Sequence, residues 1–205
     1  MKYSLLGAAA IAAFALSGCG AVNSLIPDID NLAALDGTTV DTTVGTGRAV
    51  ISGNVSKTAT FADRDLPQKN QLKRLKLRQS LNEKVTVTMP EGKPFPATFA
   101  LRNLELKIRL SDSETRTVEA SATVAGPLTY TREGTTNVYA LSSPVEISNI
   151  TFDGSKFTTL RDIITTAPTP NTVVARFSLD AEDTELPSGT VLRFSLQGGK
   201  AKVEL

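Results

Sequence analysis

This chain of 205 residues carries 22 Lys and Arg against 21 Asp and Glu, a formal net charge of +1 at neutral pH. Such a balanced chain lacks the basic excess that is typical of nucleic-acid-binding domains, so we expect no nucleic acid among its partners. It contains no His and one Cys, which excludes Ser-His-Asp and Cys-His catalysis and the His/Cys clusters that bind zinc. We therefore predict no cofactor and no metal site.

The first residues, MKYSLLGAAAIAAFALSGC, have the organisation of a secretory signal. Lys2 is followed by an apolar stretch of twelve residues, Leu5 to Leu16. A helix needs about 20 apolar residues to cross a bilayer, so this stretch is too short. It ends in a tetrapeptide that resembles the lipobox of bacterial lipoproteins, namely Leu16, Ser17, Gly18 and Cys19. The resemblance covers only this leader, and we recognise no domain family in the rest of the chain.

The resemblance implies that the Cys19 thiol is alkylated by a diacylglycerol, that the chain is cut before Cys19, and that the new amino group is acylated. Two or more acyl chains give stable attachment to a bilayer. Gly20 follows the cysteine in place of the Asp that signals inner-membrane retention in enterobacteria. We therefore expect a lipid-anchored protein of the bacterial cell envelope, at the outer membrane. The alternative is a buried free cysteine behind an ordinary signal peptide.

The chain divides into a signal peptide (1–18), a lipidated Cys with a flexible tether (19–47) and a β domain (48–205). The tether has Pro27, several Gly and Thr pairs, and no apolar period that lasts. Such a composition buries too little apolar surface to offset the entropy of ordering. The alternative is that part of this segment packs on the domain as an extra strand.

Alternation of apolar and polar residues predicts strands through most of 48–205. In LELKIRL, Leu104 and Leu110 begin and end an apolar face, and Val118 to Val124 continues the pattern in TVEASATV. A three-residue loop at 113–115 would pair Leu110 with Val118 and Leu104 with Val124, and would set Arg109 opposite Glu119. The alternative is that Ser113-Glu114 belongs to a longer loop. The phase shift from Leu101 to Leu104 indicates a bulge.

A second pairing is predicted in RFSLQGGKAKVEL, where Gly198-Gly199 is typical of a two-residue hairpin turn. Folding there pairs Leu196 with Ala201 and Phe194 with Val203, so that both pairs are apolar on one face.

Further strands are expected at 48–61, 84–89, 98–101, 127–132, 137–141, 145–152 and 172–180. Phe157, Leu160 and Ile164 have helical spacing and predict one short helix near 155–165. The predicted fold class is an all-β antiparallel β-sandwich, jelly-roll-like or immunoglobulin-like. A lipocalin-like barrel is the alternative.

Two groups have a structural and a functional interpretation. Tyr130 and Tyr139 would pair directly across a turn at Gly134-Thr135, either as a cross-strand pair in the core or as a sugar-binding pair. The acidic run DAEDTE (180–185) is interpreted as a solvated loop, and a calcium site is the alternative.

In the segment KNQLKRLKLRQSLNEK, five basic residues precede Glu83 with no acid among them. Its leucines do not share one helical face, so a strand or an irregular loop is favoured. We predict contact with an anionic surface such as phospholipid headgroups, lipopolysaccharide or peptidoglycan. The alternative is a strand edge protected from aggregation by its charges. The five residues are Lys69, Lys73, Arg74, Lys76 and Arg78.

These observations favour a non-enzymatic envelope lipoprotein whose β domain binds or scaffolds another envelope component, a lipid, a protein or the cell wall. One alternative is a carrier of lipids or other hydrophobic ligands, which needs an interior cavity. A second is an enzyme that acts on glycans through carboxylates. The sequence leaves the partner and the oligomeric state open.

Overall fold

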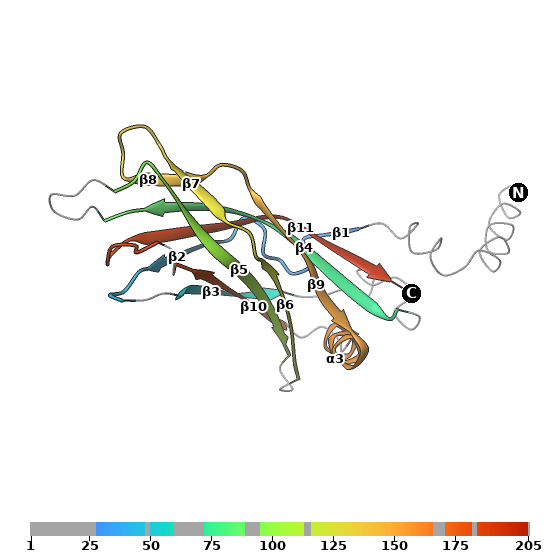
Figure 1. The fold of residues 1–205 in the computed structure, drawn as a ribbon. Helices are drawn as coiled ribbons and strands as arrows, with labels where there is room; N and C mark the ends of the chain where they lie inside the picture. Colours follow the sequence, from blue (N-terminus) through green and yellow to red (C-terminus); the bar gives the residue numbers. More distant parts are fainter. Residues whose placement is uncertain are drawn as a thin grey trace, which may run out of the picture.

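The computed structural model describes residues 28–47, 50–59, 72–88, 95–112, 116–165, 171–181 and 184–204. These residues form eleven strands of one antiparallel curled sheet and a 12-residue helix (Figure 1). The elements are β1 (Ile29–Asp30), β2 (Thr39–Thr43), β3 (Val50–Ala59), β4 (Arg74–Thr86), β5 (Thr98–Ser111), β6 (Thr117–Val124), β7 (Leu128–Arg132), β8 (Val138–Leu141), β9 (Val145–Asp153), α3 (Gly154–Thr165), β10 (Asn171–Asp180) and β11 (Val191–Glu204). The predicted all-β antiparallel fold and its short helix are confirmed.

The curled sheet forms two layers that face each other across the core. One layer contains β1, β11, β4 and β9, and the other contains β6, the second half of β5, β10 and β3. The rings of Phe177 on β10 and Phe194 on β11 stack between the layers, with centroids 5.1 Å apart. Figure 1 shows α3 at one end of the sheet and the β7–β8 hairpin at the other.

The predicted register of β5 and β6 is confirmed at every pair. Leu110 lies opposite Val118, Leu104 opposite Val124, and Arg109 opposite Glu119. The predicted bulge is also present: two residues of β5, beginning with Asn103 at φ 52°, oppose one residue of β10. This bulge lets β5 pair with β7 through its first half and with β6 through its second half.

The predicted hairpin at Gly198-Gly199 is wrong. β11 continues through both glycines as one 14-residue strand along β4. The two glycines together oppose the single residue Gln79, which is a bulge with Gly198 in the left-handed region at φ 62°. A bulge shifts the alternation by one residue, so Leu196 and Ala201 face the core from one strand instead of from two.

The bulge requires glycine at position 199, because there is no space for a side chain there. A Cβ there would lie 2.7 Å from Oε1 of Gln79 and 3.0 Å from Oδ1 of Asp36. Asp36 accepts hydrogen bonds from the backbone N–H of Gly199 at 2.8 Å and from the amide of Gln79 at 3.1 Å. The bulge is therefore held by polar contacts with the segment before β2.

Residues 28–47 pack on the domain, which is the alternative considered for the tether. β1 and β2 both pair with β11, and Leu35 and Val40 belong to the core. The apolar stretches in this segment are short and separated by turns, so the sequence shows no sustained strand or helix periodicity. The strands that they form, β1 and β2, nevertheless pair with β11. The domain therefore includes at least residues 28–47, and the boundary expected at residue 48 lies too late.

The helix α3 closes one end of the space between the layers. Its apolar face is buried, with Phe157, Leu160, Ile163 and Ile164 each 4% exposed or less. Leu160 and Ile164 reach the same core region as Leu75 and Leu110 from the two layers. The predicted helical spacing therefore marks the face that packs on the sheet.

Candidate functional site

The predicted basic segment forms most of β4, and its charges share one face of the sheet. Arg74, Lys76 and Arg78 lie on the outer face, whereas the leucines between them are buried. Lys73 is exposed just before the strand, and Lys69 lies outside the described residues. β4 is paired with β11 on one side and with β8 and β9 on the other. The interpretation as a protected strand edge is therefore wrong, because β4 is a central strand.

Two lysines of β11 complete this charged surface. Lys202 lies directly opposite Lys76, and Lys200 lies directly opposite Arg78. We call these four residues the cation block. Sequence reasoning missed the two lysines of β11. The expected hairpin at Gly198-Gly199 would have paired the segment that contains them with the first half of β11 and not with β4. Their outward positions, two residues apart in KAKVEL, were the available signal.

Carboxylates flank the cation block on both sides. Asp28 lies 3.7 Å from Arg78 and 3.9 Å from Lys202, and Asp30 lies 3.5 Å from Lys200. On the β9 side, Glu146 lies 3.7 Å from Arg78. The shortest of these ion pairs joins Lys76 to Glu204 at 2.8 Å.

Glu204 is held ionised by its neighbours. The hydrogen bond from Lys76 lowers the pKa of the Glu204 carboxyl, outweighing partial burial, and the charges of Lys76 and Arg74 lower it further. A carboxyl with a lowered pKa is a poor proton donor near neutral pH. Glu204 therefore acts as a counter-ion.

A shallow hollow of about 280 Å³ lies over the cation block. Besides the charged residues, Leu77 of β4 and Ser148 and Asn149 of β9 line it. Two residues there oppose the single residue Arg78 of β4, and Asn149 has φ 63°, so β9 bulges at this point. The hollow thus combines the cations with neutral hydrogen-bonding groups.

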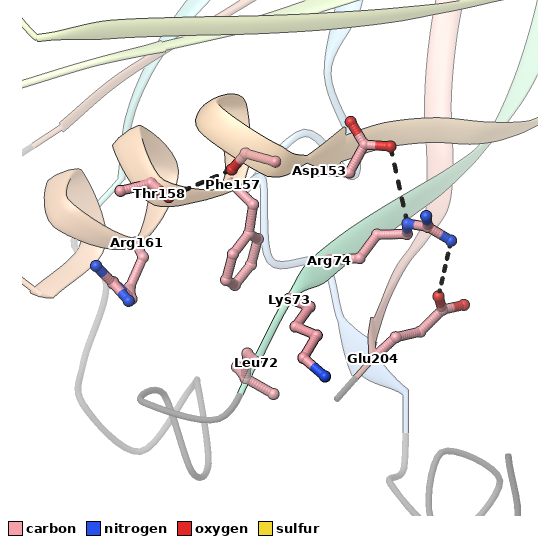
Figure 2. A pocket seen from close by; sticks show the side chains of 9 residues that line it. Leu72, Lys73, Arg74, Asp153, Phe157, Thr158, Arg161 and Glu204 are labelled. Atoms are coloured by element: carbon pink, nitrogen blue, oxygen red, sulfur yellow. Dashed lines mark hydrogen bonds and ion pairs between the residues drawn. The ribbon is translucent and has the colours of Figure 1, made fainter. Parts of the chain in front are cut away.

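A larger groove of about 740 Å³ lies beside it, where the start of β4 and the end of β11 meet α3. Figure 2 shows Leu72 and Phe157 in this groove together with the cations Lys73, Arg74 and Arg161. Arg74 bridges the two carboxylates of the groove, 3.8 Å from Asp153 and 3.3 Å from Glu204. The groove is mixed in character, with apolar side chains between charged ones.

A separate polar pair lies inside the core. Glu83 is fully buried on the inner face of β4, and the hydroxyl of Tyr130 donates a 2.5 Å hydrogen bond to its Oε2. Among the described residues, Oε1 of Glu83 has no hydrogen-bond partner. Burial raises the pKa of Glu83 to about 8, although the hydrogen bond from Tyr130 lowers it in part. Glu83 is therefore largely protonated at neutral pH.

Tyr130 and Tyr139 are both buried, as expected for a core pair, but they do not lie opposite each other. Tyr130 pairs with Leu141 and Tyr139 pairs with Arg132, because the turn between the strands is longer than two residues. Both tyrosine rings contact Phe99, stacked at 4.9 Å and edge-on at 5.2 Å. The two tyrosines are therefore core residues without an exposed aromatic surface.

Within the described part of the chain, no group of three or more His, Cys, Asp or Glu side chains is arranged to hold a metal ion. The one described helix does not meet the length and hydropathy needed to cross a membrane. Val50 is the only large hydrophobic side chain that is exposed in the described ranges. The described surface is therefore mainly charged and polar.

Comparison with known proteins gives no family. No family model and no curated protein matches the chain. A chain of the infectious bursal disease virus Gt strain is 16% identical with a TM-score of 0.34, over 87% of this chain and 31% of that one. TmCBM61 in complex with β-1,4-galactotriose is 8% identical with a TM-score of 0.28, over 80% of this chain and 68% of that one. Desmodium yellow mottle tymovirus is 13% identical with a TM-score of 0.21, over 87% of each chain. This chain thus spans about a third of the first of these, and at such TM-scores the likenesses carry no functional information.

Proposed function

We propose that this protein is a lipoprotein of the bacterial cell envelope, anchored through lipidated Cys19 at the outer membrane, whose β domain binds or scaffolds another envelope component. The observation that carries the proposal is the lipobox, which ends nine residues before Asp28, where the described domain begins. Nine residues span at most about 30 Å. An anchor at Cys19 would therefore keep the domain close to the bilayer.

The filled core supports a binding or scaffolding role over ligand carriage. Two cavities that reach the core, one beside Ile108 and one beside Leu160, measure about 10 Å³ each. A cavity of that size holds about one water molecule, far less than a lipid chain requires. The open groove and the hollow lie on the outside, where another component of the envelope has access.

The carboxylates near the groove support a role other than glycan hydrolysis. A general acid in a glycosidase needs a raised pKa. The pKa of Glu204 is lowered, and both Glu204 and Asp153 contact Arg74. Glu83 has the raised pKa but is fully buried, out of reach of a substrate. We therefore propose a non-enzymatic function.

Replacing the anchor residue tests this proposal. We expect Cys19→Ala to abolish incorporation of labelled fatty acid and to release the protein from carbonate-washed membranes, because no other residue takes the diacylglycerol. Ser24→Ala, five residues further along, should keep both the label and the membrane fraction. Fatty-acid label on Cys19→Ala, or a wild-type protein without label, would overturn the proposal.

A further inference from the structure

We infer that the cation block, Lys76, Arg78, Lys200 and Lys202, docks on the headgroup phosphates of anionic phospholipids in the membrane that holds the anchor. This inference rests on the proposed lipoprotein function and adds to it the orientation of the domain. Three observations carry it: where the chain enters the domain, how the cations are arranged, and what lies over them.

The chain enters the domain beside the block. Ile29 pairs with Ala201, so Asp28 stands next to Lys202, and it contacts Arg78 as well. Because β1 is antiparallel to β11, the direction back toward Cys19 follows β11 toward Glu204. Figure 1 shows β1, the end of β11 and the start of β4 together on one side of the molecule. Because Asp28 is the ninth residue after Cys19, this side lies within about 30 Å of the acyl chains.

The cations are arranged at a cost that a bound anion would offset. Like charges directly opposite each other destabilise a sheet, and Lys76 faces Lys202 while Arg78 faces Lys200. Charge-assisted hydrogen bonds measure about 2.7–2.9 Å. The carboxylates near Arg78 and Lys200 lie farther away, at 3.5–3.7 Å. Arg78 and Lys200 therefore keep N–H groups that can also bind another anion, whereas Lys76 forms a 2.8 Å ion pair with Glu204.

The hollow over the block suits a phosphate. Its volume of about 280 Å³ accommodates a headgroup phosphate. Its lining combines the four cations of the block with the neutral polar side chains of Ser148 and Asn149 and with the carboxylates of Asp28 and Glu146. The flanking carboxylates cancel most of the long-range field of the block, so attraction acts at contact distance. The lipid anchor supplies the local concentration that such a short-range contact needs.

Lysine labelling of the lipidated full chain in vesicles tests the inference. We expect Lys76, Lys200 and Lys202 to react with a water-soluble acylating reagent about fivefold more slowly in vesicles that contain phosphatidylglycerol than in pure phosphatidylcholine. A basic residue near an anionic surface gains about 1 kcal/mol, which corresponds to about fivefold. Lys107, which lies opposite Arg176 on the other layer, should react equally in both vesicles.

A pair of variants separates docking from a general effect of the anionic surface. The double substitution Lys76→Gln with Arg78→Gln should remove the protection of Lys200 and Lys202. The matched double substitution Lys107→Gln with Arg176→Gln removes a like-charged pair from the opposite layer and should leave the protection intact. Raising the salt concentration should abolish the protection in the wild-type protein, because salt screens the attraction between the cations and the headgroups.

Equal labelling rates in the two vesicles would overturn the inference, and so would protection that survives Lys76→Gln with Arg78→Gln or that extends to Lys107. Flotation of the same vesicles reports on the anchor separately. A chain that does not float with vesicles of either composition overturns the proposed function and the inference together. A chain that floats but shows equal labelling overturns the inference alone.

Discussion

Glu83 shows how strongly one residue can depend on its surroundings. It alternates in β4 with leucine and valine, so it points into the core opposite Phe194. An ionised carboxylate there would lack water, and the single hydrogen bond from Tyr130 does not replace its hydration. The group therefore keeps its proton, and the core tolerates Glu83 as a neutral side chain.

This burial makes the stability of the domain depend on pH. The pKa of Glu83 is about 8 in the folded protein against 4.5 when the side chain is exposed. Between these values the unfolded chain loses a proton that the folded chain keeps, so the free energy of unfolding should fall as pH rises from about 4.5, by up to about 1.4 kcal/mol per pH unit, and level off above about 8. Urea unfolding at a series of pH values measures this fall.

Glu83→Gln should remove the decline, because the amide is neutral at every pH and nearly the same size. Glu119→Gln, at an exposed position on β6, should leave the decline unchanged. A decline of the same size in Glu83→Gln as in the wild-type protein would show that Glu83 is not its source.

At the scale of elements, β11 shows how one local signal permits two structures. Gly198-Gly199 between apolar alternations is compatible with a hairpin and also with a bulge, since both bring Leu196 and Ala201 to the same face. The choice is made by β4, whose 13 residues are long enough to pair with both halves of β11. For β5 and β6, the apolar positions of the two strands agree on one register, and this register is confirmed.

Disulfide formation distinguishes the two structures of β11. With Cys19→Ala as background, Asn82→Cys with Ser195→Cys should form a disulfide under mild oxidation, because these residues lie directly opposite each other on β4 and β11. Ser195→Cys with Lys202→Cys should form none within one chain, since the two residues are about 20 Å apart along one strand. The hairpin would bring that second pair together, so a disulfide between 195 and 202 would contradict the continuous strand. Mass spectrometry after oxidation reports both outcomes.

At the scale of the whole molecule, the two layers and α3 enclose a filled core. Aromatic rings of the two layers stack on each other, and α3 inserts four apolar side chains at one end. The hollow and the groove, with their charged side chains, lie outside, along β1, β11, β4 and β9 and beside α3. The fold therefore separates a stable interior from a charged exterior on the side where the chain enters the domain.

A filled core predicts that the domain carries no lipid. Native mass spectrometry of the Cys19→Ala protein, purified from the periplasm of its own host, should give the mass of the chain alone, and lipid extraction should yield no stoichiometric lipid. Replacing Cys19 prevents the anchor's own acyl chains from adding to the signal. One lipid per chain would mean that the layers separate to admit it, and would favour a carrier.

The sequence by itself determined the features that depend on a few neighbouring residues. Alternation predicts the strands and their buried faces, helical spacing at Phe157, Leu160 and Ile164 predicts α3, and the shift from Leu101 to Leu104 predicts the bulge in β5. These patterns are local because the side-chain period of a strand or a helix is fixed by its backbone. The anchor at Cys19 is likewise an expectation from a local motif.

Only the tertiary structure decided which strands become neighbours. That decision turns Gly198-Gly199 into a bulge, brings β1 and β2 from residues 28–47 onto β11, and sets Lys200 and Lys202 beside the cations of β4. It also places Glu83 against Tyr130, 47 positions away in the chain. Each of these contacts depends on pairing between segments far apart in the sequence, because an antiparallel sheet lets one apolar strand fit several partners and the best packing of the whole core selects among them.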